Sequence, residues 1–304
     1  MKKKIKVLAV CLLPFVLAAF LLCGTTIREG VKTGLSLSYT AVLPALFPSM
    51  ILCGMIGEYT HLIPLPPAIT IWLTSQICGF PLGIRLLSRS HRCGLLSRKQ
   101  TVRLSTCCSN ASPAFLILYV GDALLKNRTA GIRLFLGQII ASASIGIALG
   151  AFEKSDARSY DPEIPLLTAF CNSVSAAASG CLVLTAYISA FSVFGVFLKE
   201  RPFLYALLEI TGGLSAIDPR KTYLIAAAVG FSGLSVMMQN SSYLVEEKLS
   251  VYPMFLSKIG YMCVLPFLLR FPQIIWIPPF FAFFFDKWRK KQYNVKKERT
   301  GVAV

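Results

Sequence analysis

Two stretches of the chain combine polar side chains with helix-breaking residues inside otherwise apolar sequence. The first runs Gln76-Ile-Cys-Gly-Phe-Pro-Leu-Gly-Ile-Arg85, and the second runs Cys107-Cys-Ser-Asn-Ala-Ser-Pro-Ala-Phe115. Gly79, Pro81 and Gly83 interrupt any helix through the first stretch. Irregular backbone at membrane depth is tolerated only where protein covers it or water reaches it, and interrupted helices often form transporter binding sites. The expected chemistry is therefore noncovalent binding of a small solute beside these three residues.

Two similar stretches occur later in the chain, at residues 207–213 and 230–240. The earlier one contains Glu209 and Thr211 between apolar residues, and the later one contains Gln239. A carboxylate inside a bilayer costs about 2.5 kcal/mol or more, so we expect Glu209 to contact a polar or proton-linked group of the solute. The alternative is a glutamate at a helix end near the membrane interface. Thr211 and Gln239 are further candidates for ligand contact.

The polar residues of the second stretch could hold an anion. Asn110 and Ser112 precede Pro113, where a helix can begin, and free backbone N–H groups at a helix N-terminus attract negative charge. An ordinary helix cap explains the same residues. Arg85 could form two parallel hydrogen bonds with a substrate carboxylate, or it could simply anchor the topology. The basic residues after it are interpreted as cytoplasmic anchors: Arg89, Arg92, Arg98, Lys99 and Arg103.

Side chains suited to covalent or metal chemistry are scarce. The chain has 2 histidines, and its 10 cysteines lie mostly in apolar runs without a Cys-x-x-Cys spacing. The sequence shows no Ser-His-Asp arrangement and no convincing set of metal ligands. We therefore expect a protein that is not an enzyme and that holds neither a metal nor a cofactor.

The composition of the chain indicates what kind of secondary structure positions these residues. The 304 residues are 55% hydrophobic and only 15% charged, and several long runs carry no charge. These features predict an all-α polytopic membrane protein. The net charge of +17 is typical of cytoplasmic loops that follow the positive-inside rule, and attraction of an anionic solute or anionic lipid is the alternative. A nucleic-acid partner is not expected, because the basic residues flank the spans.

The chain divides at its charged loops into two similar halves. Residues 1–29 are predicted to be an uncleaved transmembrane anchor, with a cleaved signal peptide as the alternative. The remaining parts are a first half at 30–152, a connecting loop at 153–163, a second half at 164–272, and a last apolar segment with a basic tail at 273–304. The number of spans and the side of the C-terminus stay open.

Several local structures are expected within the halves. In the first half, Pro44 and Pro48 kink a span at 33–57, and the proline-rich segment 62–84 is predicted to be a re-entrant hairpin. Ser97 and Gln100 form a capping box, and 129–152 is a further span. In the second half, 164–198 is interpreted as a small-residue segment that leads into one full span.

Short matches suggest that the two halves are copies of one unit. Gly79-Phe80 matches Gly230-Phe231 at an offset of 151 residues, and Glu58-x-Thr60 matches Glu209-x-Thr211 at the same offset. Copies separated by an odd number of crossings are inverted, which is the usual architecture of a secondary transporter. We therefore expect two inverted-repeat halves with re-entrant or broken helices.

Longer motifs carry a resemblance to a known family. The motifs are Gly79-Phe-Pro-Leu-Gly83, Cys108-Ser-Asn-Ala-Ser-Pro-Ala-Phe115, Leu208-Glu-Ile-Thr-Gly-Gly213 and Gly230-Phe-Ser-Gly-Leu-Ser-Val236 followed by Gln239. They resemble the nucleoside-recognition (Gate) domain, and among its members the YlbJ (SpoVV) family of sporulation integral membrane proteins, over roughly residues 30 to 270. The resemblance implies a fold similar to that of concentrative nucleoside transporters, a role in spore formation, and movement of dipicolinic acid towards the forespore.

The resulting prediction is a multi-pass protein of the cell membrane, which the resemblance would place in the outer forespore membrane. It would move a small anionic or nucleoside-like solute, with membrane lipid as its surroundings. A homo-oligomer and association with other sporulation membrane proteins stay open. The alternative function is that of a non-transporting structural or assembly factor of the spore envelope.

Overall fold

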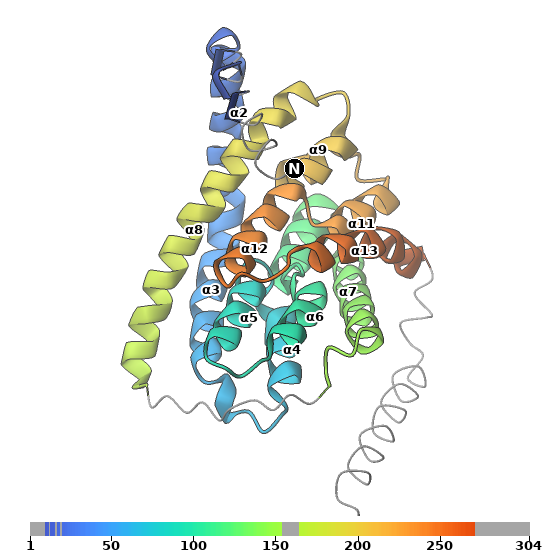
Figure 1. Ribbon diagram of the computed structural model, residues 1–304. Coiled ribbons are helices and arrows are strands. Elements are labelled where there is room, and N and C mark those ends of the chain that lie inside the picture. Colours follow the sequence, from blue (N-terminus) through green and yellow to red (C-terminus); the bar gives the residue numbers. More distant parts are fainter. Residues whose placement is uncertain (1–9, 12, 16, 19, 154–163, 271–304) are drawn as a thin grey trace, which may run out of the picture.

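The computed structural model describes residues 10–270, apart from positions 12, 16 and 19 and the loop 154–163 (Figure 1). Every regular element in this part of the chain is a helix, as the composition predicts. Four helical stretches within it are long and apolar enough to cross a membrane: Arg128–Ala148, Leu166–Phe197, Thr222–Glu246 and Tyr252–Arg270. The chain is thus a multi-pass membrane protein. The last apolar segment and the basic tail at 273–304 lie outside the described residues.

The N-terminal region is bent. Leu13–Leu22 and Gly24–Val42 meet at 91° and together would qualify as one further span. The helix α2 (Gly24–Leu37) passes through a π-helical turn, η1 (Ser38–Val42), into α3 (Leu43–Glu58). Pro44 stands in the first turn of α3 and Pro48 inside it. Proline has no N–H for the helical ladder, so the widened turn before Pro44 is the expected kink.

The segment 62–84, predicted to be a re-entrant hairpin, contains the short helix α4 (Pro67–Cys78) and the start of a second, α5 (Leu82–Arg92), which continues beyond the predicted end; both follow a single 3₁₀ turn, η2 (Thr60–Leu62). At 1.5 Å per residue, each helix is about 17 Å long, roughly half the thickness of a bilayer core. The two helices pack against each other. Their lengths suit a hairpin that enters the membrane and turns back.

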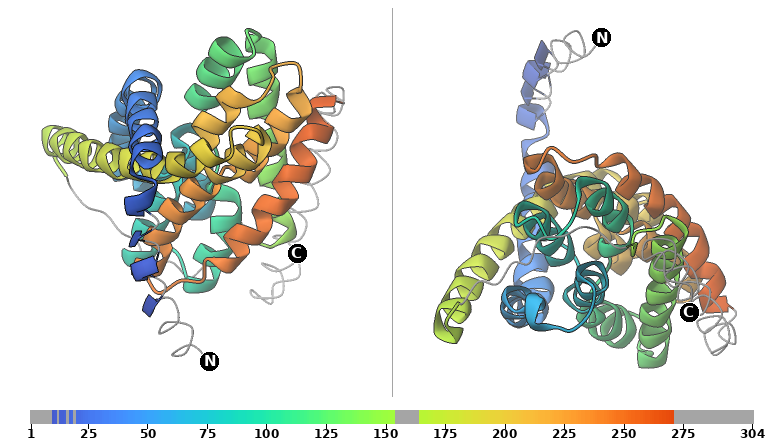
Figure 2. Two further views of the ribbon diagram at one scale, coloured as in Figure 1. Left: turned by 90° about the horizontal axis from the view of Figure 1, so that it is seen from above. Right: turned by 60° about the horizontal axis from the view of Figure 1, so that its bottom comes forward.

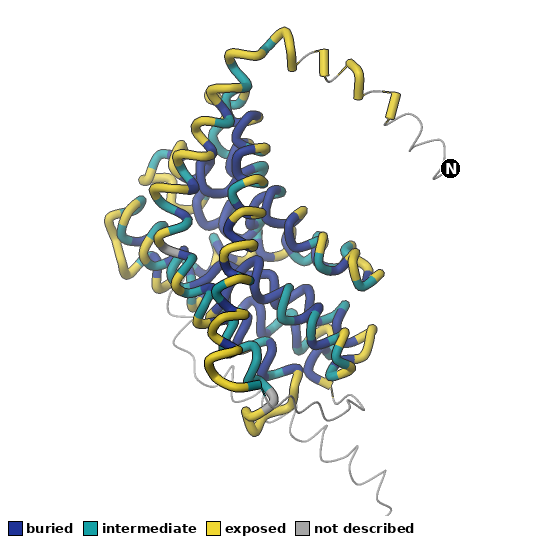
Figure 3. Tube along the Cα trace, turned by 90° about the vertical axis from the view of Figure 1, so that its left-hand side faces the viewer, coloured by how far each residue is buried: buried dark blue, intermediate teal, exposed yellow. Residues whose placement is uncertain are grey.

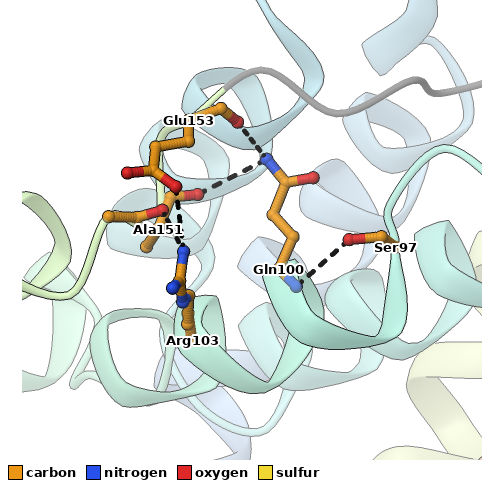
Figure 4. A network of polar contacts seen from close by, with 6 residues as sticks. Ser97, Gln100, Arg103, Ala151 and Glu153 are labelled. Carbon is orange, nitrogen blue, oxygen red and sulfur yellow. Dashed lines mark hydrogen bonds and ion pairs between the residues drawn. The ribbon is translucent and has the colours of Figure 1, made fainter.

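The next helix, α6 (Arg98–Cys108), is tied to the end of the first half (Figure 4). Its N-cap is Ser97, whose hydroxyl accepts the Gln100 N–H at 3.3 Å, as predicted. The Gln100 side chain does not return to Ser97 as a full capping box requires; it donates to the Glu153 carbonyl at 2.8 Å. Arg103 also reaches Glu153, with 3.0 Å between Nη1 and Oε2.

After α6 the backbone is irregular until a π-helical segment, η3 (Ala114–Leu124), and the chain then continues into α7 (Arg128–Ala148). The predicted span at 129–152 corresponds to α7. Its residues carry many small side chains, which let neighbouring helices approach closely. One such approach joins η3 to α7, because a Cβ added at Gly131 would lie 2.5 Å from the Leu116 carbonyl oxygen.

The prediction for 164–198 is wrong in one respect, because this segment is a single unbroken helix, α8 (Leu166–Phe197). Its small residues do not break it, and α2 approaches it closely at two glycines of α2. A Cβ added at Gly30 would lie 2.6 Å from Val193 Cα, and one at Gly34 would lie 2.5 Å from Ser189 Cα. In Figures 1 and 2, α8 lies with α2 and α3 at one edge of the molecule, while α7 and α13 form the opposite edge.

The second half repeats the order of elements seen in the first. Two short helices, α9 (Pro202–Leu208) and α10 (Ile210–Ala216), pack as a hairpin. A broken helix follows, made of α11 (Thr222–Phe231) and α12 (Leu234–Glu246). The described part ends with α13 (Tyr252–Arg270). The sequence hairpin, broken helix, helix therefore occurs twice, first as α4–α5, α6–η3 and α7.

Burial supports a membrane environment. Buried positions run through the middle of the molecule, and exposed ones follow the outer turns (Figure 3). Many of the exposed residues are large and apolar, including Leu182 and Phe194 on α8 and Ile259 and Phe267 on α13. A soluble monomer rarely presents so much apolar surface, so these helix faces are suited to lipid.

Candidate functional site

The tip of the first hairpin, residues 79–81, packs directly on the irregular segment 109–113. The Phe80 N–H donates to the Asn110 carbonyl at 2.7 Å. Gly79 has a φ of +66°, and a Cβ there would lie 2.4 Å from the Ser112 nitrogen. Only glycine combines that conformation with that contact. The two stretches singled out from the sequence are therefore in contact, with Pro81 in the same turn and joined to Phe80 by a cis peptide bond.

The other glycine of the first stretch also serves close packing. A Cβ added at Gly83 would lie 2.5 Å from the Cys108 carbonyl oxygen. The first turn of α5 therefore lies against the last residue of α6. Pro81, Gly79 and Gly83 accordingly shape the tip through the backbone rather than through a side-chain function.

Asn110 is buried and holds the irregular segment in place. Its amide donates to Gln76 Oε1 at 3.0 Å and to the Cys107 carbonyl at 2.8 Å. Gln138 of α7 holds the next residue, because it accepts the Ala111 N–H at 3.0 Å and donates to the Ala111 carbonyl at 2.9 Å. These bonds replace the helical ladder that the segment lacks.

Ser112 takes the more ordinary of the two roles considered for it. Its hydroxyl accepts the Phe115 N–H at 3.1 Å, which is a cap at the start of η3. Asn110 and Ser112 thus lie at the break between α6 and η3, as the sequence suggests, and both have protein partners.

Glu209 lies at the tip of the second hairpin, between α9 and α10, and is completely buried. Its Oε1 accepts the Thr211 N–H at 3.0 Å and its Oε2 accepts the Gly212 N–H at 2.6 Å. Both side-chain oxygens are used to cap α10, so each has a partner within the protein. Tyr119 of η3 donates its hydroxyl to the Thr211 carbonyl at 2.8 Å, which connects this tip to the first half.

The second broken helix is interrupted at Ser232 and Gly233, which both have a positive φ, of 72° and 75°. A Cβ at Gly233 would lie 3.0 Å from the Ile210 nitrogen, so the second hairpin tip contacts this break. On α12, the side chains of Ser235 and Gln239 are buried, and their polar atoms have no hydrogen-bond partner in the described structure. They lie four residues apart and so share one face of the helix.

The two breaks are linked to each other. Asn240 of α12 donates its amide to the Ser109 hydroxyl at 2.7 Å. Lys258 of α13 donates to the Ser109 carbonyl, and its Nζ lies 3.1 Å from the Ser232 hydroxyl. We use the name junction for the two hairpin tips, the two breaks and Lys258. All four segments predicted to be interrupted meet there.

Sequence reasoning missed Lys258. It is the one lysine in the apolar run that forms α13, and its side chain is only 1% exposed. An ionisable residue within a span is a signal of function in its own right. That signal was available in the sequence and would have marked this position.

The described contact of the Arg85 side chain is with α8, not with the hairpin tips or the helix breaks. Arg85 lies in the first turn of α5, and its Nη1 donates to the Ala176 carbonyl of α8 at 3.2 Å. The basic residues after it mostly bind acidic side chains: Arg89 binds Glu58, and Arg92 lies 2.5 Å from Glu247. The described contacts of Arg85 therefore place it between the junction helices and α8.

The residues matched at an offset of 151 are not structurally equivalent. Gly79 lies between α4 and α5, whereas Gly230 lies inside α11. Glu58 ends α3 and pairs with Arg89, whereas Glu209 lies at a hairpin tip. The order of elements gives a different correspondence, in which α4–α5 matches α9–α10 and α6–η3 matches α11–α12.

Metal binding by a cluster of acidic, histidine or cysteine side chains has no support within the described ranges, where no group of three such residues could hold an ion.

The chain is similar to the sporulation integral membrane protein YlbJ of Bacillus subtilis (strain 168). The two are 21% identical over 300 residues, covering 76% of this chain and 74% of that protein. No protein-family model matches the chain, and no solved structure does.

Proposed function

We propose that this protein is a secondary transporter of a small anionic or nucleoside-like solute, with its binding site at the junction. The observation that carries the proposal is Gln239, which is fully buried and whose amide oxygen and nitrogen both lack a partner among the described residues. Buried polar groups are almost always paired. An amide that offers both a donor and an acceptor beside two helix breaks is suited to bind a polar solute.

The charges around the junction favour an anionic or neutral solute over a cation. Lys258 brings an ammonium group to the breaks. The carboxylate of Glu209 is already bound by two backbone N–H groups. A substrate carboxylate would therefore gain from the positive charge without meeting an unpaired negative one.

The architecture supports transport by alternating access. Each half contributes a short hairpin and a broken helix, which is the arrangement by which inverted-repeat transporters build a site near the middle of the membrane. We propose that the two halves are inverted copies and that the fold is related to that of concentrative nucleoside transporters. The chain's residues 30–152 and 164–272 would then be the two Gate-like halves.

The similarity to a sporulation protein supports a role in spore formation. By family resemblance the solute would be dipicolinic acid, a small dicarboxylate, and the outer forespore membrane would be the location.

The test is uptake of radiolabelled dipicolinate, with uridine in parallel, into vesicles that contain the purified protein. Gln239→Leu should lower the initial rate at least about tenfold, because the substitution removes both hydrogen-bonding atoms while keeping the size of the side chain. Met238→Ala is the matched control, since Met238 is the next residue on α12 and is 47% exposed. Equal rates for Gln239→Leu and the wild type would place the site elsewhere.

A second assay uses spores. The gene should restore dipicolinate to spores of a Bacillus subtilis strain that lacks YlbJ, and the Gln239→Leu form should not. Full restoration by Gln239→Leu, together with no flux in vesicles, would instead favour a structural or assembly role in the spore envelope.

A further inference from the structure

We infer that the Lys258 ammonium is a built-in cation of the junction, in the position where transporters with broken helices bind a coupling cation, so that this protein needs no bound metal cation. The inference deepens the proposed function and rests on it. It starts from two contacts: the Lys258 Nζ donates to the Ser109 carbonyl and to the Ser232 hydroxyl. One partner belongs to each half of the chain.

Both partners stand at the C-terminal end of a helix. Ser109 follows the last residue of α6, and Ser232 follows the last residue of α11. The final carbonyl groups of a helix have no partner within it, and the helix dipole gives that end partial negative charge. Unwound carbonyls and half-helix C-termini are the groups that hold coupling cations in secondary transporters. Here an ammonium on α13 meets two such ends at once.

The surroundings of Lys258 contain no competing ion pair. None of the ion pairs among the described residues includes Lys258, and Glu209 binds backbone N–H groups of α10 instead. The ionisable groups that face it are the Cys107 thiol of α6 and the Tyr261 ring, whose centroid lies 4.9 Å from Nζ.

The other helices packed on α13 bring no charge to this point. The only ionisable side chain of α11 is the exposed Tyr223, and those of α7, Arg128 and Arg133, are exposed as well. The ammonium is therefore stabilised by carbonyl and hydroxyl oxygens, helix ends and an aromatic face. These are the kinds of ligand that a desolvated monovalent cation receives.

A tethered cation has a consequence that a free ion does not. The tethered group cannot dissociate from the junction, so added Na⁺ has no free site there through which to stabilise the protein by mass action. Removal of the Lys258 side chain beyond Cβ would leave oxygen ligands and two negative helix ends facing the space that its three carbons and Nζ now fill. A small external cation should then bind there and restore stability.

The experiment measures thermal unfolding of the purified full-length protein in detergent, in NaCl and in choline chloride at equal ionic strength. Wild type should have the same midpoint in both salts. Lys258→Ala should unfold about 5 °C lower or more, and methylammonium or Na⁺ should raise its midpoint in a saturable way. Lys99→Ala, which removes an exposed lysine of α6, should behave like wild type.

Two results would overturn the inference: a saturable stabilisation of wild type by Na⁺ over choline, or a folded Lys258→Ala that responds to no small cation. Lys258→Met is the second variant, because it fills the space without charge and should remain insensitive to methylammonium. If neither variant folds, the wild-type comparison in the two salts decides. If the protein transports neither dipicolinate nor uridine, the proposed function is wrong, but the thermal midpoints still test the role of Lys258. If flux depends on Na⁺, only the inference about Lys258 is wrong.

Discussion

The amide of Asn240 donates to the hydroxyl of Ser109 at 2.7 Å, across a sequence separation of 131 residues. Both residues are fully buried, and each lies beside a different broken helix. This bond joins the first half of the chain, at its irregular segment, to the middle of α12 in the second half. It is therefore a sensitive place to test whether the junction holds the halves together.

Asn240→Ala and Ser109→Ala should each lower stability by about 1 kcal/mol or somewhat more, because each leaves a buried polar group without its partner. The double variant should lose less than the sum, with a coupling energy of at least about 0.5 kcal/mol. Thermal midpoints of the four proteins in one detergent give the cycle. Strict additivity would show that the two side chains do not interact.

Gly79→Ala should be among the most damaging single changes at the first hairpin tip. The new Cβ would meet the Ser112 nitrogen at 2.4 Å and would also stand on a backbone with φ of +66°. Gly94→Ala is the matched control, because Gly94 has φ of +76° but no neighbour within 4 Å of an added Cβ. Gly94→Ala should cost about 1–2 kcal/mol from backbone strain alone.

The measurement for this pair is thermal unfolding together with dipicolinate flux. Gly79→Ala should lower the midpoint further than Gly94→Ala and should abolish flux, because only Gly79 contacts the broken segment. A Gly79→Ala protein that matches Gly94→Ala in both respects would mean that the tip can move away from Ser112 at no cost.

Glu209 is expected to act through the shape of the second hairpin. Glu209→Ala removes the acceptors of two buried N–H groups, those of Thr211 and Gly212, and should cost about 2–4 kcal/mol. Glu209→Gln keeps one acceptor oxygen and should retain most of the stability. Equal losses in the two variants, measured by thermal unfolding, would indicate that the negative charge matters more than the cap.

The contact between α2 and α8 gives a fourth prediction. Gly34→Leu should separate these helices, because an added Cβ already lies 2.5 Å from Ser189 Cα. Gly24→Leu is the control, since nothing lies within 4 Å of a Cβ at that position. The measurement is thermal unfolding, and the midpoint should drop for Gly34→Leu but not for Gly24→Leu. Equal midpoints would mean that the two backbones are not in close contact.

Helix breaks were the most predictable part of this fold. Glycine and proline act through local backbone geometry, which is why the interruptions at 79–81 and 109–113 could be located from sequence alone. The small residues of α8 misled the prediction, because alanine, serine and glycine are compatible both with a break and with a tightly packed helix. The packing of α8 on α2 and α3, which lie far away in the sequence, distinguishes the two cases.

Side-chain partners were less predictable, because they depend on elements far away in the chain. Arg85 looked suited to a substrate carboxylate, yet its described contact is Ala176, 91 residues later. Glu209 is buried, and its use as a cap depends on the exact start of α10. Lys258 is an exception, because a single charge within an apolar run marks it in the sequence.

The contacts between α6 and Glu153 bear on whether the protein can be expressed as two separate fragments. Gln100 and Arg103 both hold Glu153, so the last described residue before the connecting loop is fixed on the first half itself. The contacts of Ser109 with Asn240 and Lys258 join the halves without using that loop. Covalent continuity between Glu153 and Ile164 is therefore not what aligns the halves, and two co-expressed fragments divided there should assemble and co-purify.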